Sequence, residues 1–130
     1  ATDIAPAFVK HIRARAAKAG LTQVSARLGG RADVNLPAGA VDLIFLCDTY
    51  HHFEDTAQIL ASIRRALKPG GRLAVVDYHR IKGKTRPFLM RHVRAGQAVF
   101  AAEITRAGFI RLPDPPAPFL KENYLMVFRR

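Results

Sequence analysis

The 130-residue sequence predicts an α/β fold built on a mostly parallel sheet, and three observations lead to this prediction. Short apolar runs alternate with segments of helical periodicity, as expected when strands and helices follow one another along the chain. The run 41–47 is apolar at nearly every position, which is typical of a strand covered on both faces. The last two apolar runs have no helix between them, so we expect an antiparallel strand pair at one edge.

The expected elements follow from hydrophobic periodicity and from the residues that end helices. In order, they are a helix over 6–20, a strand over 24–28, a loop over 29–40, a strand over 41–47, a helix over 55–67, a strand over 73–76, a basic irregular stretch over 79–94, a helix over 95–107 and strands over 109–112 and 124–128. The residues expected to face inward from the three helices are Phe8, Ile12 and Ala16, then Ile59, Ile63 and Leu67, then Phe100 and Ile104. Asp55 or Glu54 is expected to cap the second helix, and Gly108 to end the third.

Composition limits the classes of function. No apolar run reaches the roughly 20 residues of a membrane helix, and the N-terminus does not resemble a signal peptide, so we expect no membrane partner and a cytoplasmic location. We expect Cys47, the single cysteine, to be a small buried apolar group. The five histidines show no zinc-binding spacing, so we expect no metal site.

The chain is strongly basic, with 21 Lys and Arg against 10 Asp and Glu and a net charge of +11. Such a surface should attract anions, either nucleic acid, anionic lipid or an acidic small molecule, although a merely soluble basic surface has the same composition. No nucleic-acid-binding motif is present, and the tyrosines lie far apart in sequence, so nucleic acid is possible but not favoured.

Three segments together resemble the class I S-adenosylmethionine-dependent methyltransferases. They are 1–6, similar to the end of that fold's second strand; 36–53, similar to its fourth-strand signature with a histidine pair after the strand; and 66–73, similar to the turn into its fifth strand. The resemblance covers nearly the whole chain in the right order. It implies a three-layer Rossmann-like fold, S-adenosylmethionine as cofactor, and methyl transfer to an unidentified small or anionic acceptor.

The resemblance also implies which residues bind the cofactor. Asp3 ends a strand on the side where ligands bind in open α/β sheets, so we expect it to bind the ribose hydroxyls, with capping of the helix from residue 6 as the alternative. The position of the family's acidic residue near adenine is occupied by Gly30 in this sequence. Asp33, three residues further on, is expected either to take that role or to be a turn residue. Cys47 and Asp48, at the end of the run 41–47, are expected beside the cofactor.

The residues after the run 41–47 should border the methyl group. Asp48 and His51 are the candidate catalytic residues, because a base is needed where the acceptor must lose a proton. The alternative is that the histidines only pack and orient the loop. Tyr50 and His52 should also border this region, Asp77 and Tyr78 are weaker candidates for the acceptor pocket, and Asp42 should be structural.

In the family, a first strand, a helix and a glycine-rich turn precede the segment that resembles residues 1–6. We therefore expect 1–130 to be a single truncated domain in which the edge of strand 41–47 is unpaired, and in which the cofactor binds weakly or not at all. An upstream segment or a second copy of the chain should fill this gap, because a long apolar edge promotes association.

Two other functions are compatible with these residues. The basic stretch 79–94 could bind an anionic acceptor or be a solvated loop, and the net charge would also suit a non-enzymatic anion-binding or nucleic-acid-binding module on a degenerate methyltransferase fold. A nucleotide-dependent dehydrogenase would use Asp3 equally well. The histidine pair and the final strand pair favour methyl transfer.

Overall fold

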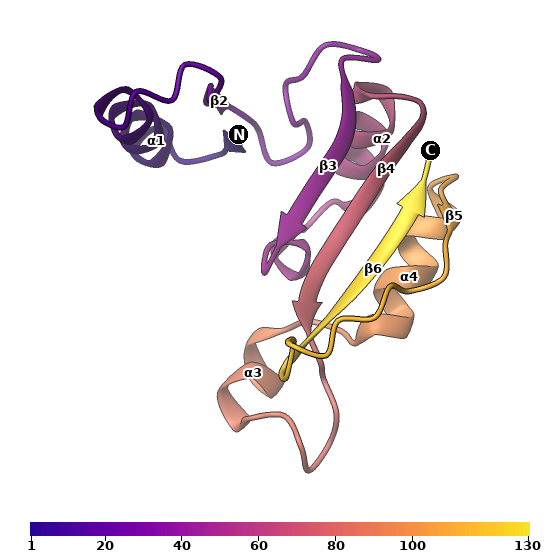
Figure 1. Cartoon of the computed structure of the whole chain (residues 1–130). Coiled ribbons are helices and arrows are strands. Elements are labelled where there is room, and N and C mark those ends of the chain that lie inside the picture. The colour runs from indigo at the N-terminus through magenta and orange to yellow at the C-terminus, as the bar shows by residue number, and fades with distance from the viewer.

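The computed structural model describes residues 1–130 and contains two separate sheets. A four-stranded sheet has the order β3-β4-β6-β5, and β1 pairs with β2 in a sheet of two short parallel strands (Figure 1). The strands are β1 (Thr2–Asp3), β2 (Arg27–Leu28), β3 (Val41–Cys47), β4 (Leu67–Tyr78), β5 (Ile110–Arg111) and β6 (Asn123–Arg129). The helices are α1 (Pro6–Lys18), the 3₁₀ helix η1 (Tyr50–His52), α2 (Thr56–Ala66), α3 (Pro87–His92) and α4 (Gln97–Arg106). None of the helices has the length and hydropathy of a bilayer-crossing segment.

The larger sheet is mixed, with one parallel and two antiparallel strand pairs, so it is less parallel than the sequence predicts. β3 and β4 are parallel, while β6 runs antiparallel to both β4 and β5. The antiparallel pair β5–β6 lies at one side of the sheet, with β5 at the edge. This arrangement confirms the α/β class and the expected position of the last two strands.

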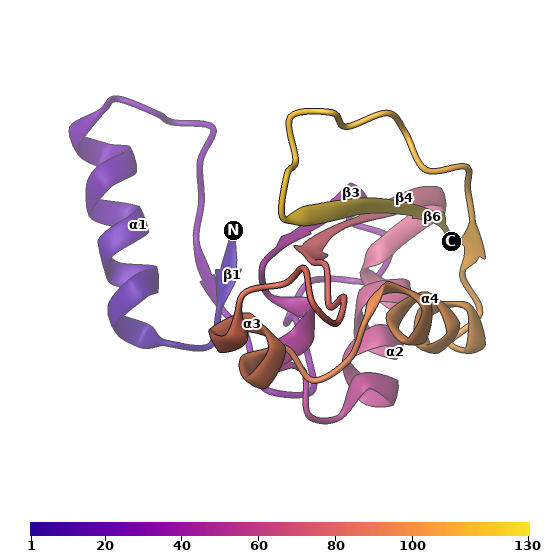
Figure 2. The same cartoon turned by 90° about the horizontal axis from the view of Figure 1, so that it is seen from below.

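The hydrophobic core lies between this sheet and two helices. Figure 2 shows α2 and α4 on one side of the sheet and no helix on the other side. Asp55 caps α2 by accepting a hydrogen bond from the Gln58 N–H, and Ile59 and Ile63 on that helix are buried. The other inward residues expected from α4 and the end of α2 are also fully buried: Leu67, Phe100 and Ile104. Gly108 has a φ of +88°, which ends α4 as predicted.

The expectation that β3 is covered on both faces is wrong. Leu43 and Phe45 are 56% and 58% exposed, because no helix packs on their side of the sheet. Cys47 points the same way and is exposed rather than buried. β3 lies at the edge of the four-stranded sheet, and its outer side has no hydrogen-bonded neighbour in the chain.

Two further expectations need correction. Phe8 is 62% exposed instead of facing inward, and Val9 and Ala16 are the buried residues of α1. The basic stretch 79–94 is not irregular throughout, because Pro87, at the first position of α3, starts a helix that buries Leu89. Figure 1 shows that α1 lies with β1 and β2, apart from the four-stranded sheet.

Candidate functional site

The carboxyl ends of β1 and β3 meet around an open cavity of about 650 Å³. Its lining includes Asp3, Ile4 and Phe8 from the first segment of the chain, and Asp48, Thr49 and His52 from the segment after β3. Ligands of open α/β folds bind at this end of the strands. The structure therefore brings together two of the predicted site residues, Asp3 and Asp48, that are 45 positions apart in sequence.

Asp3 ends β1, and its two carboxylate oxygens differ in their contacts. Oδ1 accepts a hydrogen bond of 2.8 Å from the Ala5 N–H, just before α1 begins. Oδ2 makes no hydrogen bond within the chain, and Asp3 lines the cavity. The carboxylate holds the residue before α1 and can still accept a hydrogen bond from a ligand, but it does not cap the helix, because the N-cap is Ala5 and no side chain bonds to the first turn.

Asp48 is held in place by β4 and β6. Its N–H donates to the Val76 carbonyl at 2.9 Å, and its Oδ1 accepts from Asn123 Nδ2 at 2.7 Å. Its φ of +49° lies in the left-handed region, which aspartate tolerates better than most residues. Burial, and then the charge of Asp48, raise the pKa of the neighbouring Tyr78. Asp48 is one of the residues that line the cavity.

His51 is turned into the protein instead of lining the cavity. It is 5% exposed, and its Nδ1 lies 2.8 Å from Asp77 Oδ1. Asp77 is fully buried and also accepts hydrogen bonds from the N–H groups of His51 and Tyr78. Asp77 therefore orients the loop after β3 through His51, as in the alternative role considered for the histidines.

The other residues after β3 divide between core and cavity. Tyr50 is fully buried, and its hydroxyl lies 3.0 Å from Glu103 Oε2, so it belongs to the core and does not border the cavity as expected. Burial and the Glu103 charge raise the pKa of Tyr50. His52 lines the cavity. The pKa of His52 is lowered by burial first and then by the neighbouring His51 and His92.

Asp33 and Cys47 are not among the residues that line the cavity. Asp33 Oδ1 accepts from the Asn35 N–H at 2.8 Å, and Oδ2 lies 2.6 Å from Arg65, so its contacts are those of a turn residue. The Asn35 N–H, followed by Arg65, lowers the pKa of Asp33. The expected contact of Asp33 with adenine stays a prediction, and so does the expected contact of Cys47 with the cofactor. Asp42 pairs with Lys68 at the opposite end of β3, as expected for a structural residue.

Sequence reasoning missed several cavity residues. Phe8 was assigned to the core, since helical spacing does not distinguish a face against the core from one against a cavity. Arg31 and Glu54 line the cavity as an exposed ion pair of 3.0 Å, and only the fold brings these two loops together. Gly30, which occupies the position of the family's acidic residue, lies on the same wall.

The basic side chains after β4 are of two kinds. Arg86 and Arg94 form ion pairs with Glu122 and Glu103, at 2.7 and 2.6 Å. The remaining basic side chains of the stretch are exposed and form no ion pair with a carboxylate: Arg80, Lys82, Lys84 and Arg91. The stretch thus retains four positive charges that could meet an anion.

Comparison with known proteins places this geometry in a family. The family model described as "Methyltransferase domain" matches residues 1–75. A Saccharothrix syringae protein named nocamycin O-methyltransferase is 38% identical over 73 residues, which are 56% of this chain and 26% of that protein. A Mycolicibacterium smegmatis protein named "probable S-adenosylmethionine-dependent methyltransferase" is 32% identical over 111 residues, which are 82% of this chain and 41% of that protein. The chain thus spans less than half the length of these two relatives.

Solved structures show the same fold. A methyltransferase from Aquifex aeolicus, described as dependent on S-adenosylmethionine, superposes with a TM-score of 0.86 at 20% identity, covering 98% of this chain and 66% of that one. Geranyl diphosphate methyltransferase, solved in complex with S-adenosylmethionine, gives a TM-score of 0.76 at 12% identity, over 99% of this chain and 67% of that one.

Proposed function

Because this chain belongs to the class I S-adenosylmethionine-dependent methyltransferases, we propose that it takes part in methyl transfer to a small or anionic acceptor at the cavity between Asp3 and Asp48. The observation that carries this proposal is that two acidic residues, Asp3 at the carboxyl end of β1 and Asp48 just after the carboxyl end of β3, line one cavity. In this fold type such a position suits a nucleoside-containing ligand.

The residues of the cavity fit the cofactor. Asp3 Oδ2 would accept hydrogen bonds from the ribose hydroxyls, since it has no partner within the chain. Ile4 and Phe8 are 59% and 62% exposed and offer an apolar surface to the purine ring. Asp48 adds a negative charge on the same wall, which suits the positive sulfonium. When bound, the cofactor supplies an activated methyl group whose sulfur leaves as a neutral thioether.

Asp48 and His51 would then have different roles in the reaction. Asp48 lines the cavity and His51 does not, so Asp48 is the residue that would accept a proton from an acceptor that must lose one. His51 lies behind that wall, bonded to Asp77, and would position the loop that carries Asp48. Correct placement of donor and acceptor supplies much of the catalysis in such a displacement.

The charge of the chain supports an anionic acceptor. Arg80, Lys82 and Lys84 follow the carboxyl end of β4, are exposed and form no ion pair with a carboxylate. Their fields would raise the local concentration of an anion near this end of the sheet.

Titration calorimetry with S-adenosylhomocysteine tests the proposal. We expect Asp3→Asn to weaken binding at least about tenfold, because a charge-assisted hydrogen bond contributes roughly 1.5–3 kcal/mol. Asp42→Asn, at the far end of β3, should leave binding unchanged. Equal affinities for wild type and Asp3→Asn would contradict the proposal. Salt-dependent binding of RNA without cofactor binding would instead favour the non-enzymatic module.

A further inference from the structure

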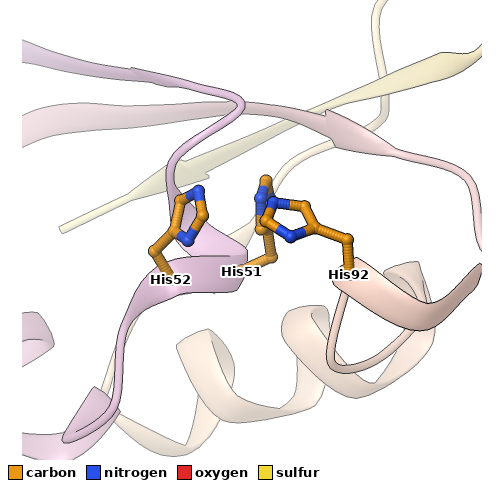
Figure 3. Close-up of side chains that lie close together, drawn as sticks. All are labelled: His51, His52 and His92. Atoms are coloured by element: carbon orange, nitrogen blue, oxygen red, sulfur yellow. The ribbon is translucent and has the colours of Figure 1, made fainter. Parts of the chain in front are cut away.

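Three histidines from two segments of the chain form a cluster beside the cavity. His51 and His52 lie on η1, and His92 ends α3, 40 positions further along the chain. Their rings lie close together (Figure 3), and one ligand nitrogen of each lies within 4.8 Å of the others. The ring centroids are 4.1 Å apart for His51 and His52, and 5.0 Å apart for each pair with His92.

The buried member of the cluster has an unused nitrogen. Both Asp77 oxygens accept backbone N–H groups, which identifies the side chain as a carboxylate acceptor, so His51 donates from Nδ1. In the neutral ring, Nε2 of His51 then carries the lone pair, and this buried atom has no hydrogen-bond partner within the chain. A buried polar atom without a partner is costly and requires an explanation.

A metal ion would provide the missing partner. Imidazole nitrogen is a common protein ligand of metal ions, zinc among them, and metal-binding histidines generally donate their other N–H to a carboxylate or carbonyl oxygen. The pair His51–Asp77 already has this arrangement, with the side chains 2% and 0% exposed. We propose that His51, His52 and His92 bind one divalent transition-metal ion of the zinc class through their imidazole nitrogens.

The cluster can reach the required geometry without a change of fold. Zinc–nitrogen bonds of about 2.0–2.1 Å at tetrahedral angles place ligand nitrogens about 3.3 Å apart. The ligand nitrogens now lie within 4.8 Å of one another. His52 and His92 are exposed, so rotation of their side chains can bring these nitrogens closer together. Phe88 stacks on His92 with a centroid distance of 5.3 Å and an angle of 13°, which supports that ring on its outer side.

The position of the cluster determines what such an ion could contact. His52 also lines the cavity that contains Asp3 and Asp48. Three protein ligands leave a fourth position for water or another oxygen ligand, as in zinc sites of the open type. Metal binding by these residues does not depend on the proposed methyl transfer, and the two are tested separately.

Cobalt(II) is a suitable probe because its visible absorption reports the ligands and geometry of a zinc-type site. Tag-free protein, treated with a chelator and dialysed, would be titrated with Co²⁺ and then with Zn²⁺. We expect one Co²⁺ per chain, an absorption spectrum typical of nitrogen ligands in four-coordinate geometry, and its loss on addition of Zn²⁺. Absence of stoichiometric Co²⁺ and Zn²⁺ binding would overturn the proposal.

Variants separate the cluster from chance binding by other histidines. His52→Asn and His92→Asn change exposed side chains, so they should fold normally, and each should weaken Co²⁺ binding at least about tenfold. His11→Asn, an exposed histidine on α1 outside the cluster, should bind as wild type does. Unchanged affinity in the double variant His52→Asn/His92→Asn, with a native circular dichroism spectrum, would equally overturn it.

Discussion

Replacement of Asp77 by asparagine should destabilise the protein strongly, although the two side chains have nearly the same shape. The carboxylate is fully buried and accepts three hydrogen bonds: from Tyr78 N–H at 2.7 Å, His51 Nδ1–H at 2.8 Å and His51 N–H at 3.1 Å. An asparagine NH₂ group in place of either oxygen faces at least one backbone N–H that then loses its acceptor. The one orphaned donor costs about 1–3 kcal/mol, and the loss of charge weakens the remaining bonds by about 1 kcal/mol.

We therefore expect Asp77→Asn to lower the free energy of unfolding by about 2–4 kcal/mol, out of a total of roughly 5–15 kcal/mol for a domain. Urea denaturation followed by circular dichroism, with a chelator present to exclude metal effects, measures the difference. Asp42→Asn removes an exposed carboxylate paired with Lys68, and should cost no more than about 1 kcal/mol. If Asp77→Asn changed stability as little as this control, Asp77 would not be the residue that holds the loop.

Three further predictions concern other parts of the fold. The Arg94 hydrogen bond lowers the pKa of Glu103, so the stability that this carboxylate adds is present above its unfolded-state pKa and is lost as pH falls through the lowered value. The advantage of wild type over Glu103→Gln in urea should therefore shrink as pH falls below the ordinary carboxyl value of 4.5. Gly71→Ala should lower the free energy of unfolding, measured by thermal denaturation, by roughly 1–3 kcal/mol, because the new Cβ would lie 2.9 Å from a carbonyl oxygen. Gly70→Ala should lower it by about 1 kcal/mol, because Gly70 has a φ of +75° but open space around it. Sedimentation should show self-association through the unpaired edge of β3 that Phe45→Lys reduces, and a stable wild-type monomer would contradict this expectation.

Much of the fold could be predicted from the sequence, because local patterns define its elements. Periodic apolar residues and Asp55 located α2, and the continuous apolar run located β3 with its correct bounds. The last two strands were recognised as antiparallel from the missing helix between them. These features depend on residues close together in sequence, where periodicity and capping act.

The candidate site could be predicted only in part. Asp3 and Asp48 were expected at strand ends and do share a cavity, since parallel strands bring their carboxyl ends to one side. His51 and Tyr50 were expected beside that cavity but face the interior, because η1 turns successive side chains in different directions. The direction of each side chain in a single helical turn depends on the residues that pack against that turn, and these come from other parts of the chain.

The sequence by itself therefore determined the α/β class, the order of the elements and the family, all of which follow from short-range patterns and motif order. Only the tertiary structure decided which side chains meet. His92 joins His51 and His52 because α3 folds back toward the loop after β3, and no spacing along the chain encodes that approach. The exposure of Phe45 and Cys47 likewise depends on which face the helices cover, and hydrophobicity alone cannot specify it.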